Sequence, residues 1–171
     1  MMKHLSLIPA AISSLRIAFL PLFFYFYSKS DIIACLVVLA FSAATDFLDG
    51  YIARKLRATS LFGTYYDAAT DFIFVVGIFA VFSAKGYYPI WLLVLITISF
   101  VLFLTTGQYV KKIYDPIGKY IGSALYIGIV LTLLFPAQEM FSFVQFAFVG
   151  FFLISIGSRI VSLAKKTSRA M

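Results

Sequence analysis

Long apolar runs follow one another from end to end of this 171-residue chain, and they restrict its fold more than any other feature. A helix needs about 20 residues to cross the hydrocarbon core of a bilayer. Short connections with Gly, Pro, Ser or Lys separate the runs. The pattern predicts six spanning helices, near residues 5–28, 31–53, 60–84, 88–112, 116–135 and 138–164.

Composition excludes a soluble domain attached to an anchor. Hydrophobic residues make up 63% of the chain and charged residues 12%, whereas soluble domains carry about 25% charged residues. We therefore expect an all-α membrane protein, with residues 1–171 forming a single domain and one six-helix transmembrane bundle. No cleavable signal peptide is expected, because Arg16 interrupts the first run and the run continues beyond it. The net charge is +7, but the basic residues do not form the clustered, soluble basic face of a nucleic-acid-binding protein, so this function is not expected.

Basic residues predict the orientation in the membrane. Eleven of the 14 Lys and Arg residues lie at one set of helix ends, and only Lys29 and Lys85 lie at the other. Because cytoplasmic loops carry the excess of Lys and Arg, both termini should face the cytoplasm. The expected location is a cell membrane, crossed several times.

Four of the seven acidic residues lie in the stretch 46–71, on the facing ends of the second and third predicted helices: Asp46, Asp49, Asp67 and Asp71. If these helices form an antiparallel hairpin that turns near Ala58, the acids form two matched levels, roughly 13 Å and 18–20 Å from the turn. Within each helix the two acids are about 60° or 40° apart around the axis, so each pair shares a face. The four carboxylates should therefore meet in a polar cavity on the cytoplasmic side.

These acids require compensation. Each carboxylate at membrane depth costs about 2.5–3.5 kcal/mol, and buried charges in membranes usually mark a functional site. Two divalent cations would neutralise the four, and hard oxygen ligands suit Mg²⁺ or Mn²⁺. Gly50, Ala53 and Gly63 lie on the same faces and leave room for a ligand; the alternative is that they only allow close helix packing.

The residues from Asp46 to Asp71 read Asp-x2-Asp-Gly-x2-Ala-Arg-x8-Gly-x3-Asp-x3-Asp. This pattern resembles the motif of the CDP-alcohol phosphotransferases, and every fixed position and spacing agrees. The resemblance implies an enzyme of phospholipid synthesis that takes the phosphatidyl-type group from a CDP-lipid such as CDP-diacylglycerol. The group passes to the hydroxyl of a small alcohol, and CMP is released.

The resemblance also implies a role for each motif position. The four Asp residues would hold two metal ions, and Asp71 would in addition act as the general base. CDP would be bound by residues between the two acidic pairs: Gly50, Ala53, Arg54, Ser60 and Gly63. A homodimer is implied in the same way.

Two weaker resemblances concern the acceptor. Residues 8–16, from Ile8 to Arg16, are similar to the Pro-Asn-x-x-Thr-x-x-Arg opening of many bacterial relatives, although Ala10 replaces the Asn. Arg16 should lie level with the acids, so either substrate phosphate or the acids must compensate it. Gly118-Lys119 is similar to the Gly-Lys of glycerophosphate-accepting members. Candidates for holding an acceptor phosphate are Arg159, Lys119, Lys111 and Arg16. They favour glycerol phosphate or inositol phosphate as the acceptor.

A small cation transporter or channel that uses the intramembrane acids is the alternative function. It predicts acids along the whole membrane depth. The outer halves of the second and third helices, such as residues 32–40 and 73–82, contain no carboxylate. The distribution therefore favours the enzyme.

Overall fold

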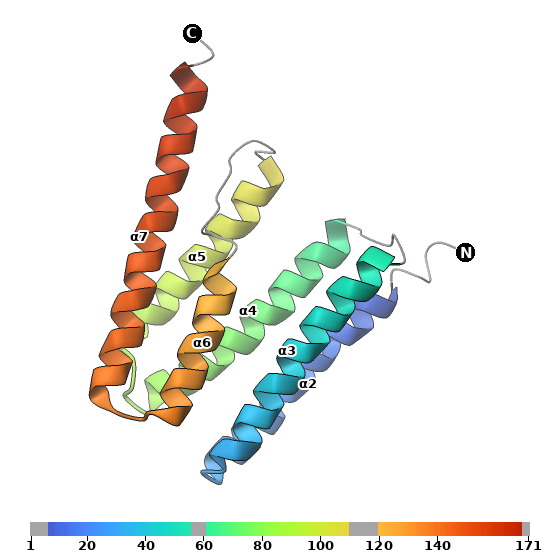
Figure 1. The fold of residues 1–171 in the computed structure, drawn as a ribbon, viewed down its shortest axis with the longest axis vertical. Coiled ribbons are helices and arrows are strands. Elements are labelled where there is room, and N and C mark those ends of the chain that lie inside the picture. The colour runs from blue at the N-terminus through green and yellow to red at the C-terminus, as the bar shows by residue number, and fades with distance from the viewer. Residues whose placement is uncertain (1–6, 56–60, 110–119, 169–171) are drawn as a thin grey trace. The chain divides into compact units, whose positions relative to one another are not determined.

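The computed structural model describes residues 7–55, 61–109 and 120–168 (Figure 1). Within these ranges it does not describe the side chains at 7–13, 46, 47, 49–55, 61, 62, 64, 106–109 and 162–168. The described residues form six helices and no strand: α2 Leu7–Ser28, α3 Ile32–Lys55, α4 Leu61–Ala84, α5 Ile90–Tyr109, α6 Ile121–Leu134 and α7 Gln138–Ser168. Each helix falls on one of the six predicted apolar runs, so the all-α fold class and the helix order are confirmed.

Local backbone chemistry sets the turn between α4 and α5. Gly86 has a φ of 81°, which is the left-handed conformation that glycine adopts without strain. Its N–H donates to Ser83 O at 2.9 Å, and the N–H of Tyr87 donates to Phe82 O at 3.0 Å. This pair of bonds is a Schellman ending, which satisfies carbonyls that the helix leaves without partners. The Lys85-Gly86 turn predicted from the sequence is thus a helix stop.

The connection between α2 and α3 is equally short. Ser30 takes the left-handed conformation with a φ of 58°, and the N–H of Asp31 donates to Phe26 O at 3.1 Å. The Asp31 carboxylate then accepts from the N–H of Ala34 at 3.0 Å. An Asp in this place caps the start of a helix. The three-residue link therefore makes α2 and α3 an antiparallel hairpin (Figure 1).

The chain divides into two compact units, residues 1–78 and 79–171. In the first unit α2 packs along α3, with Phe23, Cys35 and Leu39 in the core. Helix α4 approaches α2 closely at Gly77, where a Cβ atom would lie 2.8 Å from Cδ2 of Leu20. This close approach joins the two helices that carry the candidate site.

In the second unit α6 packs against α7. A Cβ atom at Gly128 would lie 2.9 Å from Cγ1 of Val144, so the two helices touch there. The hydroxyl groups of Tyr88 and Thr132 are 2.6 Å apart, and both residues are buried. These contacts tie the α4–α5 connection to α6.

Two described helical segments are both long and apolar enough to cross a membrane, Tyr65–Ala84 and Gln138–Val161. The other four helices contribute shorter apolar segments, at Ser14–Ser28, Ile32–Thr45, Ile90–Thr105 and Ile121–Leu134. Large apolar side chains are also exposed; Ile33 and Ile90 are each 76% exposed. Membrane association agrees with these segments, whereas a six-span bundle remains a prediction.

Candidate active site

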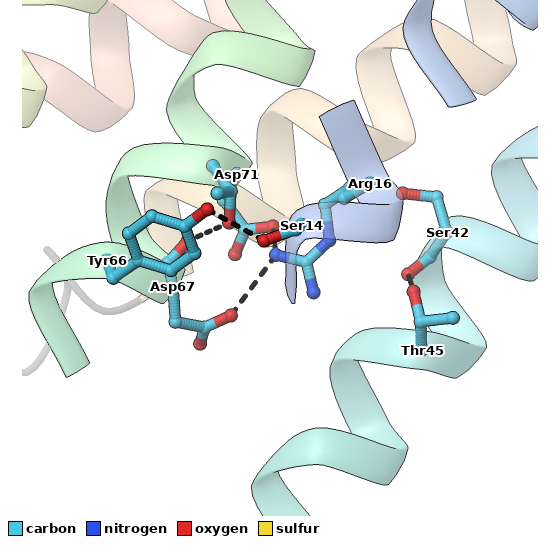
Figure 2. A network of polar contacts seen from close by, with 8 residues as sticks. Ser14, Arg16, Ser42, Thr45, Tyr66, Asp67 and Asp71 are labelled. Atoms are coloured by element: carbon cyan, nitrogen blue, oxygen red, sulfur yellow. Dashed lines mark hydrogen bonds and ion pairs between the residues drawn. The ribbon is translucent and has the colours of Figure 1, made fainter. Parts of the chain in front are cut away.

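A buried arginine meets two of the predicted carboxylates inside the first unit. Arg16 of α2 has no exposed surface, and its Nη1 atom donates to Oδ1 of Asp67 on α4 at 3.3 Å. The same Nη1 atom forms a second ion pair with Oδ1 of Asp71. Figure 2 shows both carboxylates turned toward the guanidinium. The structure thus brings Arg16, Asp67 and Asp71 together, as charge compensation by the site's acids predicts.

Helix geometry explains why one arginine reaches two acids. Asp67 and Asp71 are four residues apart, so their side chains share one face of α4. Between them, Thr70 is buried and its hydroxyl donates to the Asp67 carbonyl at 2.8 Å. The acids remain partly open to solvent, with 36% and 39% of their side chains exposed. A substrate or an ion can therefore approach them, while Arg16 lies beneath.

A pair of hydroxyls fixes α2 against α4 beside this ion pair. Ser14 Oγ and Tyr66 Oη are 2.7 Å apart. Ser14 precedes Arg16 by two residues, and Tyr66 directly precedes Asp67 (Figure 2). Sequence reasoning did not identify this pair. The sequence feature that could have indicated the pair is the position of these two hydroxyl groups beside charged residues in otherwise apolar helices.

Helix α3 contributes a polar face to the same region. Ser42 is fully buried, and its carbonyl accepts from the Thr45 hydroxyl at 2.7 Å. In Figure 2 the Ser42 side chain points toward α2, on the Arg16 side. Positions 46 and 49 follow Ser42 by four and seven residues, which is a rotation of only about 40° and 20° from it. The register therefore places both positions on the Ser42 face of α3.

The remaining predicted residues are described in part. The backbone at Asp46, Asp49, Gly50, Ala53 and Arg54 belongs to α3, but their side chains lie outside the described part. Gly63 lies on α4, one turn before Asp67, and is half-buried. Ser60, Lys111 and Lys119 lie outside the described residues. Arg159 lies on α7 in the second unit and is buried, with 8% of its surface exposed.

The described acids suit divalent metal ions. Both carry hard carboxylate oxygens one helical turn apart, which are the ligands that Mg²⁺ and Mn²⁺ prefer, and both also pair with the Arg16 guanidinium. Within the described side chains, no group of three or more Asp, Glu, His or Cys residues gathers. The described half of the site thus fits a metal centre whose other predicted ligands are Asp46 and Asp49.

Comparison with known proteins adds an independent observation. The sequence profile of the CDP-alcohol phosphatidyltransferases matches residues 6–160. The chain belongs to this family. The match includes α2, α3 and α4, with the whole Asp46–Asp71 motif, and it confirms the family inferred from that motif. Membership in this transferase family agrees with a place in phospholipid synthesis at a membrane.

Individual CDP-alcohol phosphatidyltransferases resemble the chain over a shorter stretch. A CDP-diacylglycerol–glycerol-3-phosphate 3-phosphatidyltransferase of Pseudomonas fluorescens is 36% identical over 88 residues, which cover 50% of this chain and 45% of the relative. Proteins with the same description from Yersinia enterocolitica and Pectobacterium atrosepticum are 32% and 31% identical over 88 residues, 48% of each relative. The chain thus spans about half the length of the curated relatives that it matches. No solved structure matches it.

Proposed function

We propose that the chain transfers a phosphatidyl group from CDP-diacylglycerol to the hydroxyl of glycerol 3-phosphate and releases CMP. The observation that carries this proposal is the convergence of two motif carboxylates, Asp67 and Asp71, on one buried arginine within a CDP-alcohol phosphatidyltransferase chain. The similarity to glycerol-3-phosphate 3-phosphatidyltransferases favours glycerol 3-phosphate over inositol phosphate as the acceptor. Family membership also favours the transferase over the cation-transporter alternative.

The proposed reaction uses metal ions, and the four acids of the motif would bind them. Asp46, Asp49, Asp67 and Asp71 would hold two divalent cations, Mg²⁺ or Mn²⁺. When bound, such a pair of ions neutralises the diphosphate oxygens and polarises the phosphorus–oxygen bond. The hard oxygen donors and the absence of His and Cys from the motif support this choice over zinc.

The protein's own groups would handle the proton and the phosphates. The acceptor oxygen attacks the phosphorus that carries the diacylglycerol, and the bond from that phosphorus to the CMP oxygen breaks. Asp71, with its partly exposed carboxylate, takes the hydroxyl proton. Arg54 would pair with a phosphate of CDP through its guanidinium fork, beside Gly50, Ala53, Ser60 and Gly63.

The acceptor's phosphate needs cations of its own. Arg159 is the first candidate, because it is a buried charge on an apolar helix. Lys119 and Lys111 are the next candidates, since both belong to the basic side of the predicted topology. With this topology, the site would lie on the cytoplasmic side of a six-helix bundle. The family resemblance implies, in addition, that the protein forms a homodimer.

The test is release of CMP by the purified protein in detergent or lipid nanodiscs. CDP-diacylglycerol is the donor, and the acceptors are glycerol 3-phosphate, inositol phosphate, glycerol and inositol, each with Mg²⁺, Mn²⁺ or EDTA. We expect CMP release that requires both a metal ion and glycerol 3-phosphate, with phosphatidylglycerol phosphate as the lipid product. CMP release with inositol phosphate but not with glycerol 3-phosphate would contradict the acceptor assignment. Failure with every acceptor, or full release in EDTA, would contradict the proposed reaction.

A further inference from the structure

The Arg16 guanidinium contacts two of the four metal ligands of the proposed function, Asp67 and Asp71. One nitrogen atom, Nη1, contacts Oδ1 of both Asp67 and Asp71. These oxygens are also the atoms that a divalent ion would coordinate. Arg16 and a metal ion are both positively charged, and they therefore compete for the same oxygen atoms.

We propose that Arg16 is a built-in counter-cation, which holds Asp67 and Asp71 together without metal and which a divalent ion must displace from at least one carboxylate. This inference rests on the proposed function only in taking Asp67 and Asp71 as metal ligands. Arg16 is thus a positioning residue, because it acts through the two carboxylates and not on the reacting atoms.

Burial explains why a counter-cation is needed. Two carboxylates on adjacent turns of one helix repel each other, and like charges four residues apart destabilise a helix. A fully buried arginine likewise costs several kcal/mol unless it is paired. The two problems cancel when Arg16 faces both acids. In the metal-free site, Arg16 then holds the two acids on either side of one nitrogen atom.

Packing explains why Arg16 remains near the acids after it is displaced. The Ser14–Tyr66 hydroxyl pair holds α2 against α4 two residues before Arg16. The contact of Leu20 with Gly77 holds the same helices together four residues after it. Because α2 contacts α4 on both sides of Arg16, the guanidinium stays close to the acids when it turns away from them.

Competition has a measurable sign. If an ion pair between Arg16 and a carboxylate must open before the metal ion binds, only the molecules with an open pair can bind the ion. The apparent metal affinity is then reduced in proportion to the fraction of such molecules. Arg16→Gln removes the competitor and leaves a neutral side chain of similar length. We expect Mn²⁺ to bind this variant about tenfold more tightly, because charge-assisted hydrogen bonds are strong but these acids are partly exposed.

The experiment measures Mn²⁺ binding by electron paramagnetic resonance of the free ion, together with thermal unfolding in EDTA and in Mn²⁺. Arg16→Gln should bind Mn²⁺ more tightly than the wild type, unfold at a lower temperature in EDTA, and gain more stability from Mn²⁺. Arg16→Lys keeps the charge without the planar fork, so its Mn²⁺ affinity should lie between the two. Lys29→Gln is the matched control: it removes one exposed positive charge just beyond the far end of α2 and should leave Mn²⁺ binding unchanged.

Unchanged or weaker Mn²⁺ binding in Arg16→Gln would overturn the proposal, because removal of a cation that competes for the Asp67 and Asp71 oxygens must increase metal affinity. If Arg16→Gln does not fold, an Mn²⁺ affinity of Arg16→Lys at or below that of the wild type overturns it equally. None of these measurements requires turnover. Tighter Mn²⁺ binding in a protein that never releases CMP would support the counter-cation and contradict the proposed function alone.

Discussion

Replacement of Asp71 by Asn separates the chemistry of the site from its stability. The change removes one negative charge while keeping the shape of the side chain, and the amide oxygen still accepts a hydrogen bond from Arg16. Asp67, 3.3 Å from the same guanidinium nitrogen, remains as an ionised partner. Arg16 is therefore not left as a buried charge without compensation.

The structure gives the expected size of both effects. Hydrogen bonds to charged groups contribute about 1.5–3 kcal/mol. Because 39% of the Asp71 side chain is exposed, we reduce this to about 1 kcal/mol. A loss of that size lowers the unfolding temperature of a chain this long by about 2–4 °C. Loss of a general base slows a reaction by about 10²–10⁴-fold, so the rate should fall far more than the stability.

The assay combines CMP release at saturating Mn²⁺ with CDP-diacylglycerol binding and thermal unfolding. Asp71→Asn should fold and retain donor binding, but it should lose transfer. Asp31→Asn is the control, because Asp31 is an exposed carboxylate that caps α3 and asparagine caps helices equally well. Turnover of Asp71→Asn at the wild-type rate would remove Asp71 as the base. Loss of folding in Asp71→Asn but not in Asp31→Asn would contradict the small stability effect expected here.

Three further predictions test individual contacts. Ser14→Ala and Tyr66→Phe should each lower the unfolding temperature by a few degrees, and the double variant should lose little more, because both changes break the same bond; additive losses would contradict a direct contact. Thr132→Val leaves the buried Tyr88 hydroxyl without its partner and should cost about 1–3 kcal/mol in the free energy of unfolding, measured by denaturant titration; an unchanged midpoint would contradict this. Arg159→Gln should raise the KM for glycerol 3-phosphate while leaving the KM for CDP-diacylglycerol unchanged, and a rise only for the donor would exclude Arg159 from the acceptor's phosphate.

The helices were predictable because each apolar run and its punctuation are local features. The Lys85-Gly86 turn and the run from Gln138 are found where the sequence places them. Helix α7 continues to Ser168, four residues past the predicted end, because Lys165 and Lys166 are good helix formers once the helix has started.

Contacts between helices were predictable only where charge required them. An arginine at the depth of the acids had to be neutralised, and the structure pairs it with Asp67 and Asp71. The Ser14–Tyr66 pair could not be predicted in this way. Neutral hydroxyls can satisfy themselves within their own helix, so their pairing depends on the rotation of each helix about its axis, which the pattern along one segment does not determine.

The missing side chain at Gly77 leaves room for Leu20 of α2 to lie against α4. Residue 77 lies about 9 Å along α4 from Asp71, and a methyl group added there would lie 2.8 Å from Cδ2 of Leu20, so the end of this side chain would have to turn aside. A substitution at this neutral position would therefore change the packing of α2 on α4 near the Arg16 ion pairs. Alanine or serine at residue 77 would do so without altering a single charged group.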